Sequence, residues 1–255
     1  MSYKKALYLL GILTIFLIAS CNSDKPSKSR SDFSYIEVSD SLEGVKKIEN
    51  FIKPYHDTLE VELNKVISYS KEDLLTSRGT GKLESTLGNL ISDLVYEQAS
   101  ERYKNNFGKQ IDFAVFNRGG IRTPIAKGDI TLRHMFEIMP FENTLIVVTL
   151  DSVKMTELLN YMANSKGHPM SNIRLKIKDN MATDVSIGGK DYDKTKQYKI
   201  VTTDYLQHGG DRMYFFSDPL SIDTLDYKMR DAMIDYFEKT DTVNVELDGR
   251  FTYAE

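Results

Sequence analysis

"FNRGGIRTPI" occupies residues 116–125 and closes an apolar run, "IDFAVFN", that is typical of a strand buried on both faces. Two adjacent glycines, Gly119 and Gly120, allow the backbone to bend at positive φ or to approach another group closely. Arg122 follows the bend, where a guanidinium suits a phosphate, a carboxylate or a ring. Taken alone, these residues predict a loop between two strands that carries a surface arginine.

A second glycine pair lies in "DYLQHGGDRMYFF", residues 204–216, and it also follows an apolar run, "YKIVTT". Ligands of α/β proteins bind in the crevice beyond the carboxyl ends of the strands. The bend at Gly209 and Gly210, with Asp211 beside it, is therefore predicted to face the same ligand as the bend before Arg122.

Each bend has an aromatic residue near it, Phe141 in "MPFENTL" and Tyr205 in "DYLQHGGD". Two rings can hold a planar base between them, and stacking contributes roughly 1–3 kcal/mol per base. Simpler roles stay open from the residues alone: a core ring for Phe141, a turn or helix cap for Asp211, and a structural hydrogen bond for Asn89 in "LGNLISD".

Predicted strands and helices alternate along the chain, which indicates an α/β fold with a mixed β-sheet flanked by helices. Hydrophobic periodicity is the basis of each assignment. The predicted strands are residues 65–70, 111–117, 143–150, 173–177, 185–187, 197–206 and 243–253. The predicted helices are residues 41–52, with a break or a new start at Pro54, and 85–103, 131–139, 151–165 and 224–239.

The first twenty residues have the pattern of a signal peptide: a basic start at Lys4 and Lys5, then an apolar run that ends at Cys21. A plain membrane anchor is the alternative, but the run is short for a spanning helix. Residues 18–21, "IASC", resemble the bacterial lipobox, and Cys21 is the only cysteine. We therefore expect Cys21 to carry lipid, such as palmitate, on an exported lipoprotein of the cell envelope, at either face of the outer membrane.

Residues 21–37 are rich in Ser and Lys and predict a flexible tether, so the folded domain is expected over residues 38–255. The formal net charge of the whole chain is -4, which gives no indication of a nucleic-acid polymer as partner.

Four motifs in order, "LGNLISD", "FNRGGIRTPIAKGDIT", "MPFENTL" and "DYLQHGGD", resemble the C-terminal domain of the 5'-nucleotidases. That domain recognises the nucleoside part of the substrate. The resemblance implies that Phe141 and Tyr205 stack on the base and that Asp211 accepts hydrogen bonds from the ribose hydroxyls. It also implies that Asn117 and Arg122 contact the substrate.

The sequence departs from the family pattern in two places. Gly81 stands where a further substrate arginine is expected, so Arg78 or Lys82 becomes the candidate replacement. After Asp211 the family continues with glycine and an aromatic residue, whereas this chain has Arg212 and Met213. Additional contacts are expected from the backbone at Gly119, Gly120, Gly209 and Gly210.

Hydrolysis in this family belongs to an N-terminal metallophosphatase domain that holds two metal ions through Asp-x-His and Gly-Asn-His-Glu motifs. The sequence contains neither motif and has four histidines in all. We therefore expect no catalytic or metal-binding residue in this chain, and divalent metals only in a separate metallophosphatase that would complete a split 5'-nucleotidase. The alternative is a stand-alone lipoprotein that binds nucleosides or nucleotides, and a neighbouring gene for an exported metallophosphatase would favour the split enzyme.

Overall fold

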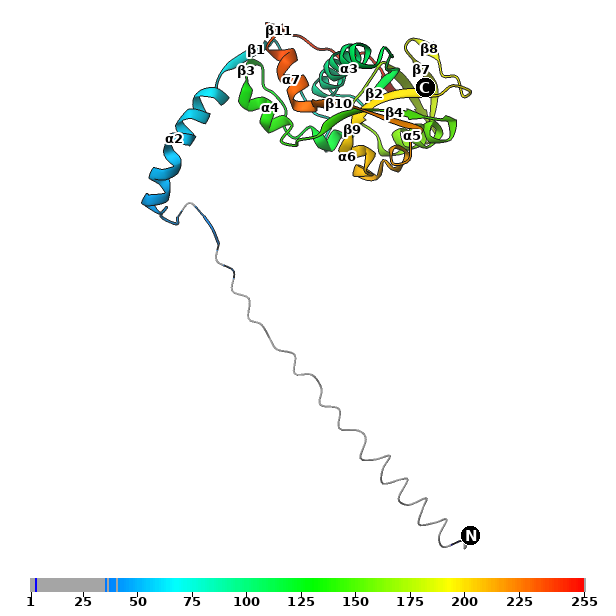
Figure 1. Cartoon of the computed structure of the whole chain (residues 1–255). Helices are drawn as coiled ribbons and strands as arrows, with labels where there is room; N and C mark the ends of the chain where they lie inside the picture. The colour runs from blue at the N-terminus through cyan, green and yellow to red at the C-terminus, as the bar shows by residue number, and fades with distance from the viewer. Residues whose placement is uncertain (1–2, 4–34, 36, 40, 255) are drawn as a thin grey trace. The chain divides into compact units, whose positions relative to one another are not determined.

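The computed structural model describes residues 3, 35, 37–39 and 41–254 (Figure 1). The signal peptide predicted for residues 1–20, the lipid site at Cys21 and nearly all of the tether lie outside the described residues. The chain divides into two units, residues 1–50 and 51–255. The start of the folded domain at residue 38 stays a prediction.

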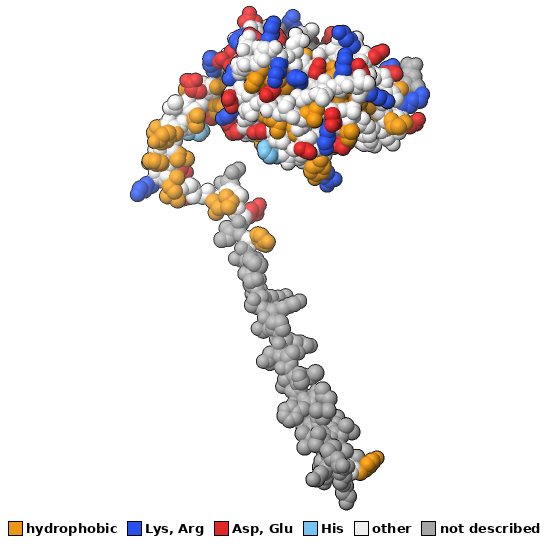
Figure 2. Space-filling view, turned by 45° about the vertical axis from the view of Figure 1, so that its right-hand side comes forward, with side chains coloured by type: hydrophobic (Ala, Val, Ile, Leu, Met, Phe, Trp, Pro, Cys, Tyr) orange, Lys and Arg blue, Asp and Glu red, His pale blue; other side chains and the backbone are white. Residues whose placement is uncertain are grey.

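Helix α2 (Lys46–Leu63) begins in the first unit and ends in the second. The break expected at Pro54 is wrong, because the helix continues through it and the Thr58 hydroxyl donates to the Pro54 carbonyl at 2.9 Å. None of its residues is buried, and Figure 2 shows hydrophobic side chains along it. No helix in the described part of the chain combines the length and apolar character needed to span a bilayer.

The second unit contains three β-sheets, and its central sheet mixes parallel and antiparallel pairs. The central sheet has the order β10 (Ser221–Lys228), β4 (Thr144–Leu150), β9 (Tyr198–Thr203), β2 (Phe113–Val115), β5 (Met170–Ser171). A three-stranded sheet pairs β11 (Thr242–Val243), β1 (Val66–Ser70) and β3 (Gly128–Thr131). A four-stranded sheet pairs β12 (Phe251–Tyr253), β6 (Ile173–Lys178), β7 (Met181–Ile187) and β8 (Lys190–Asp191).

The central sheet separates two hydrophobic cores. Side chains of a strand alternate between its faces, so Val147 and Val201 enter one core while Val148 and Ile200 enter the other. Helices α3 (Thr86–Phe107), α4 (Leu132–Ile138) and α7 (Met229–Phe237) contribute to the first core, and α5 (Ser152–Ser165) contributes to the second. Burial of both faces explains the continuous apolar runs, and the predicted α/β fold with a mixed sheet is confirmed.

Local capping explains where two of the predicted helices begin and end. The Ser85 hydroxyl caps α3 by accepting from the Gly88 amide at 3.1 Å, and Gly108 ends this helix at φ 66. Asp151 caps α5, because its carboxylate accepts from the Lys154 amide at 2.9 Å.

Other predicted elements also differ in the structure. Residues 224–228, predicted as helix, form the end of β10, because Thr224 pairs with Ile146 on the neighbouring β4. Residues 204–206, predicted as strand, belong to helix α6 (Asp204–Gln207). The closing strand predicted over residues 243–253 is not continuous. Val243 belongs to β11, and only residues 251–253 form the last strand, β12.

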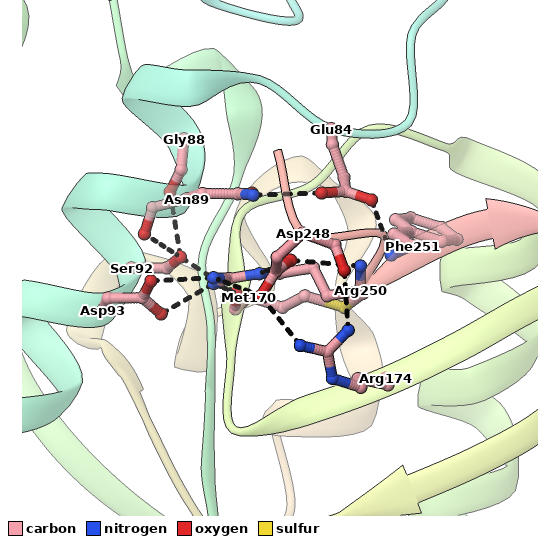
Figure 3. Close-up of polar contacts among 10 residues, drawn as sticks. All are labelled: Glu84, Gly88, Asn89, Ser92, Asp93, Met170, Arg174, Asp248, Arg250 and Phe251. Carbon is pink, nitrogen blue, oxygen red and sulfur yellow. Dashed lines mark hydrogen bonds and ion pairs between the residues drawn. The ribbon is translucent and has the colours of Figure 1, made fainter. Parts of the chain in front are cut away.

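Arg250 links three elements of the second unit (Figure 3). Its guanidinium donates to the two carboxylate oxygens of Asp93 in α3 at 2.6 and 2.8 Å and to the Met170 carbonyl of β5 at 2.9 Å. It also donates to Asp248 at 2.9 Å, and Arg174 pairs with the same carboxylate. The side chain of Arg250 is only 11% exposed, so these contacts lie partly shielded from water.

Asn89 makes a structural hydrogen bond, one of the roles that its residue type allows. It is buried, and its amide donates to the Glu84 carboxylate at 3.0 Å (Figure 3). The other oxygen of Glu84 accepts from the Phe251 amide at 3.0 Å, so this pair joins the start of α3 to β12.

Candidate functional site

The two glycine bends lie at the carboxyl ends of adjacent parallel strands. β2 and β9 pair in parallel, and each is followed along the chain by the segment that carries its bend. Asn117 and the 3-10 turn η1 (Arg118–Gly120) follow β2, while α6 and the 3-10 turn η2 (Gly210–Arg212) follow β9. The strand pairing therefore brings together segments that are about ninety residues apart in the sequence.

A cleft of ≈ 190 Å³ lies between these bends and the turn before β4. Its lining includes all five residues that the family resemblance assigns to the substrate, together with the first glycine pair. The lining residues are Asn117, Gly119, Gly120, Arg122, Phe141, Asn143, Tyr205 and Asp211. Sequence reasoning missed Asn143, although it belongs to the motif "MPFENTL".

Asp211 has its carboxylate held in place by two neighbours. Asn117 donates to Oδ2 at 2.7 Å and the Tyr205 hydroxyl donates to Oδ1 at 3.1 Å, while the Tyr161 hydroxyl donates to the Asp211 backbone carbonyl at 2.8 Å. Asp211 adopts the left-handed conformation, at φ 51, which Asp tolerates better than most residues. Each carboxylate oxygen can accept more than one hydrogen bond, so the group can still receive donors from a ligand.

The Tyr205 ring lies directly against the backbone of the second glycine pair. A Cβ at Gly210 would meet the ring at 2.5 Å, so only glycine fits under it. Partial burial, and then the hydrogen bond to Asp211, raise the pKa of Tyr205. The hydroxyl therefore stays protonated at neutral pH and remains a donor to the carboxylate.

The two rings of the cleft are both accessible. Phe141 is 41% exposed and Tyr205 is 45% exposed. Phe141 is therefore not a core ring. The Arg122 guanidinium carbon lies 5.8 Å from the centre of the Phe141 ring, within the range of a cation–π contact, and Arg122 also donates to the Gly119 carbonyl at 3.1 Å.

Asp204 ties the two ring-bearing segments together. Its Oδ1 accepts from the Thr144 amide at 3.1 Å and from the Tyr205 amide at 2.7 Å. The start of β4, which follows Phe141 and Asn143, is thereby joined to the first turn of α6.

Arg230 of α7 holds the turn that presents Phe141. It is buried, donates to the carbonyls of Met139 at 3.1 Å and Phe141 at 3.4 Å, and forms an ion pair with Glu142. The two cationic neighbours, Lys228 first and then Arg230, lower the pKa of Glu142. The chain before and after Phe141 is therefore held by two different helices, α7 through Arg230 and α6 through Asp204.

The remaining predicted residues lie beside the cleft. Arg78 lines a neighbouring cleft of ≈ 650 Å³, which shares Gly119 and Asp211 with the first. Lys82 lines neither of these two, and instead lines a third hollow together with Arg78. Gly209 and Gly210 line a depression that reaches Tyr205 and Asn143. Across residues 3, 35, 37–39 and 41–254, no three His, Cys, Asp or Glu side chains gather as a metal site would require.

The fold defines an α/β domain with a cleft beyond the carboxyl ends of two parallel strands. The sequence profile of the 5'-nucleotidase C-terminal domain matches residues 66–218. The chain therefore belongs to the 5'-nucleotidase family, through the C-terminal domain of that family.

Known relatives are much longer than this chain. A 5'-nucleotidase of Vibrio parahaemolyticus is 28% identical over 180 residues, which are 68% of this chain and 30% of the relative. The trifunctional nucleotide phosphoesterase protein YfkN of Bacillus subtilis is 25% identical over 246 residues, 87% of this chain and 16% of the relative. The chain thus spans less than a third of each.

A solved structure has the same fold. A 5'-nucleotidase precursor from Thermus thermophilus superposes with a TM-score of 0.67 at 24% sequence identity. The match covers 82% of this chain and 44% of that one.

Proposed function

We propose that the cleft lined by Phe141 and Tyr205 binds the nucleoside part of a nucleotide. The observation that carries the proposal is the Asp211 carboxylate, which Asn117 and Tyr205 hold beside two half-exposed rings. A base would stack between the rings, and the ribose hydroxyls would donate to the carboxylate. Arg122, on the same wall as Phe141, would supply a fork of donors to the substrate.

The wider proposal is that the chain is the recognition half of a split, exported 5'-nucleotidase. Hydrolysis of the phosphate ester would then take place on a separate metallophosphatase, which would hold the divalent metals. Support comes from the family membership and from a sequence that contains neither metallophosphatase motif. The second candidate function is a lipoprotein that binds nucleosides or nucleotides without taking part in catalysis.

Calorimetry with adenosine and AMP on residues 22–255 tests the binding site. Phe141→Ala and Tyr205→Ala should each weaken binding about 5- to 150-fold, because each removes one stacked ring. Tyr69→Ala, which removes a similarly exposed ring from β1, is the matched control and should leave binding unchanged. Normal binding in both ring variants would show that the rings do not contact the ligand.

Phosphate release from AMP tests the split enzyme. We expect no chelator-sensitive hydrolysis by the purified chain, and we expect hydrolysis when the partner metallophosphatase that the split-enzyme proposal requires is added. Chelator-sensitive hydrolysis by the chain alone would rule out the split enzyme. A phosphatase whose activity does not respond to the chain would favour the stand-alone binding protein.

The proposed location is the cell envelope, with the chain anchored through lipid on Cys21. Fatty-acid labelling of wild type and Cys21→Ser tests it, and the substitution should remove both the label and the membrane association. Persistence of both would contradict the lipoprotein assignment.

A further inference from the structure

The cleft beside the proposed nucleoside site carries an excess of positive charge. Among the described residues that line its ≈ 650 Å³ are three arginines, Arg78, Arg118 and Arg212, and a single acidic residue, Asp211. Within the described part of the chain, none of these arginines has an ion-pair partner within 4.0 Å. Arginines that surround a hollow without carboxylate partners are suited to bind an anion.

The Arg118 side chain is anchored at its tip. One of its terminal nitrogens donates to the Lys166 carbonyl at 2.8 Å, and its other guanidinium N–H groups have no acceptor among the residues that the structure describes. His168 lies behind it, and its Nδ1 accepts from the Arg118 amide at 3.4 Å. Burial, and then the charge of Arg118, lower the pKa of His168 to about 4. The histidine is therefore neutral at pH 7, and the positive charge of this cleft comes from its arginines.

The two clefts meet at Gly119 and Asp211. Under the proposed function, Asp211 accepts from the ribose hydroxyls, so the arginine-lined cleft begins at the 2',3' edge of the sugar. Arg212 also stands where the family pattern has glycine, and therefore adds a cation to this edge.

We propose that the arginine-lined cleft binds a second phosphate, carried on the 2'- or 3'-oxygen of a nucleotide whose base lies between Phe141 and Tyr205. This inference rests on the proposed nucleoside site, and it specifies which class of substrate that site prefers. Arg118 and Arg212 are the specificity residues, and the preferred ligand is a nucleoside bisphosphate rather than a 5'-monophosphate.

Calorimetry on residues 22–255 tests the inference with adenosine and uridine, their 5'-monophosphates, their 3',5'-bisphosphates and inorganic phosphate. For adenosine or for uridine, wild type should bind the 3',5'-bisphosphate about tenfold or more tightly than the 5'-monophosphate of the same nucleoside. This is the gain expected from at least one hydrogen bond to a charged group. Added salt should reduce this preference, because screening weakens exposed charge pairs.

The double variant Arg118→Gln/Arg212→Gln should lose the preference and keep its affinity for the 5'-monophosphate. Arg133→Gln, on α4 and outside both clefts, is the matched control and should keep the preference. The comparison of ligands on wild type remains decisive even if the double variant does not fold.

The other outcomes separate the two proposals. Equal affinities of wild type for bisphosphate and monophosphate, with ring-dependent binding of both, overturn the phosphate subsite and leave the nucleoside site standing. A further outcome is that inorganic phosphate binds through Arg118 and Arg212 while the bisphosphates bind no more tightly than the monophosphates. This result would show that the cleft binds free anions, and it would also overturn the inference. Failure of every nucleoside and nucleotide to bind overturns both proposals.

Discussion

Asp211 is the residue on which the proposed recognition chemistry depends most. Its left-handed backbone and its hydrogen bonds from Asn117 and Tyr205 set the direction of the carboxylate. A group that is already oriented loses little conformational freedom when a ligand binds, so more of the interaction energy appears as affinity.

Replacing Asp211 should reduce the discrimination between ribose and deoxyribose. With Asp211→Asn, the preference for adenosine over 2'-deoxyadenosine should fall about tenfold or more, because a hydrogen bond to a charged group contributes roughly 1.5–3 kcal/mol. The Kd values of both ligands measure the effect. Asp218→Asn, an exposed acid nearby that lines neither cleft, is the control, and an unchanged preference in Asp211→Asn would contradict the ribose contact.

His168 should make stability depend on pH. Its pKa of about 4 lies below the usual 6.5, so the unfolded chain binds the proton more readily than the folded chain. The contribution of this residue is complete above pH 6.5 and is lost as the pH falls toward 4, by roughly 3 kcal/mol in total. Urea unfolding of wild type and His168→Asn at several pH values should show a stability difference that shrinks on acidification. A difference that stays constant with pH would contradict the assignment.

At the scale of elements, the cleft depends on how the turn between α4 and β4 is held. Arg230 comes from α7 and fastens this turn through two carbonyls and Glu142, while Asp204 fastens the start of β4 to α6. Neither residue lines the cleft at Phe141. The position of the Phe141 ring is therefore set by residues that would not contact the ligand.

Arg230→Met should lower both stability and affinity. The free energy of unfolding should fall by about 1.5–3 kcal/mol, because buried carbonyls lose a charged donor. Adenosine should bind more weakly as the turn becomes mobile. Arg133→Met, which breaks a more exposed ion pair with Glu60, should cost less than about 1 kcal/mol and should leave adenosine binding unchanged. Equal effects of the two substitutions would contradict the positioning role.

At the scale of the whole second unit, Arg250 connects helix α3 to β5 and to the chain just before β12 (Figure 3). These elements belong to different sheets and cores, so the network joins parts of the unit that the strand ladders do not connect.

Arg250→Met should lower the free energy of unfolding by about 2–3 kcal/mol, since it leaves Asp93 and the Met170 carbonyl without their donor. Urea denaturation measures the change. Arg174→Met removes a half-exposed partner of the same Asp248 and should cost less than about 1 kcal/mol. Similar losses for both variants would show that the buried contacts of Arg250 add nothing.

The sequence by itself determined the main elements and the residues of the proposed nucleoside site. The apolar runs of β4 and β9 and the capped helices α3 and α5 were predictable because periodicity and capping act between residues that are close in the chain. Asn117, Arg122, Phe141, Tyr205 and Asp211 were found because they belong to short motifs, and the structure brings them around one cleft.

Only the tertiary structure decided the identity of β10 and the existence of the arginine-lined cleft. Residues 224–228 have a helical pattern, but their pairing with β4 is a contact across about eighty residues of sequence, which local propensity does not contain. The second cleft likewise collects Arg78, Arg118, Tyr161, His168 and Arg212 from separate segments. Such a group forms only when packing of the two cores places those segments together, because its members share no periodicity in the sequence.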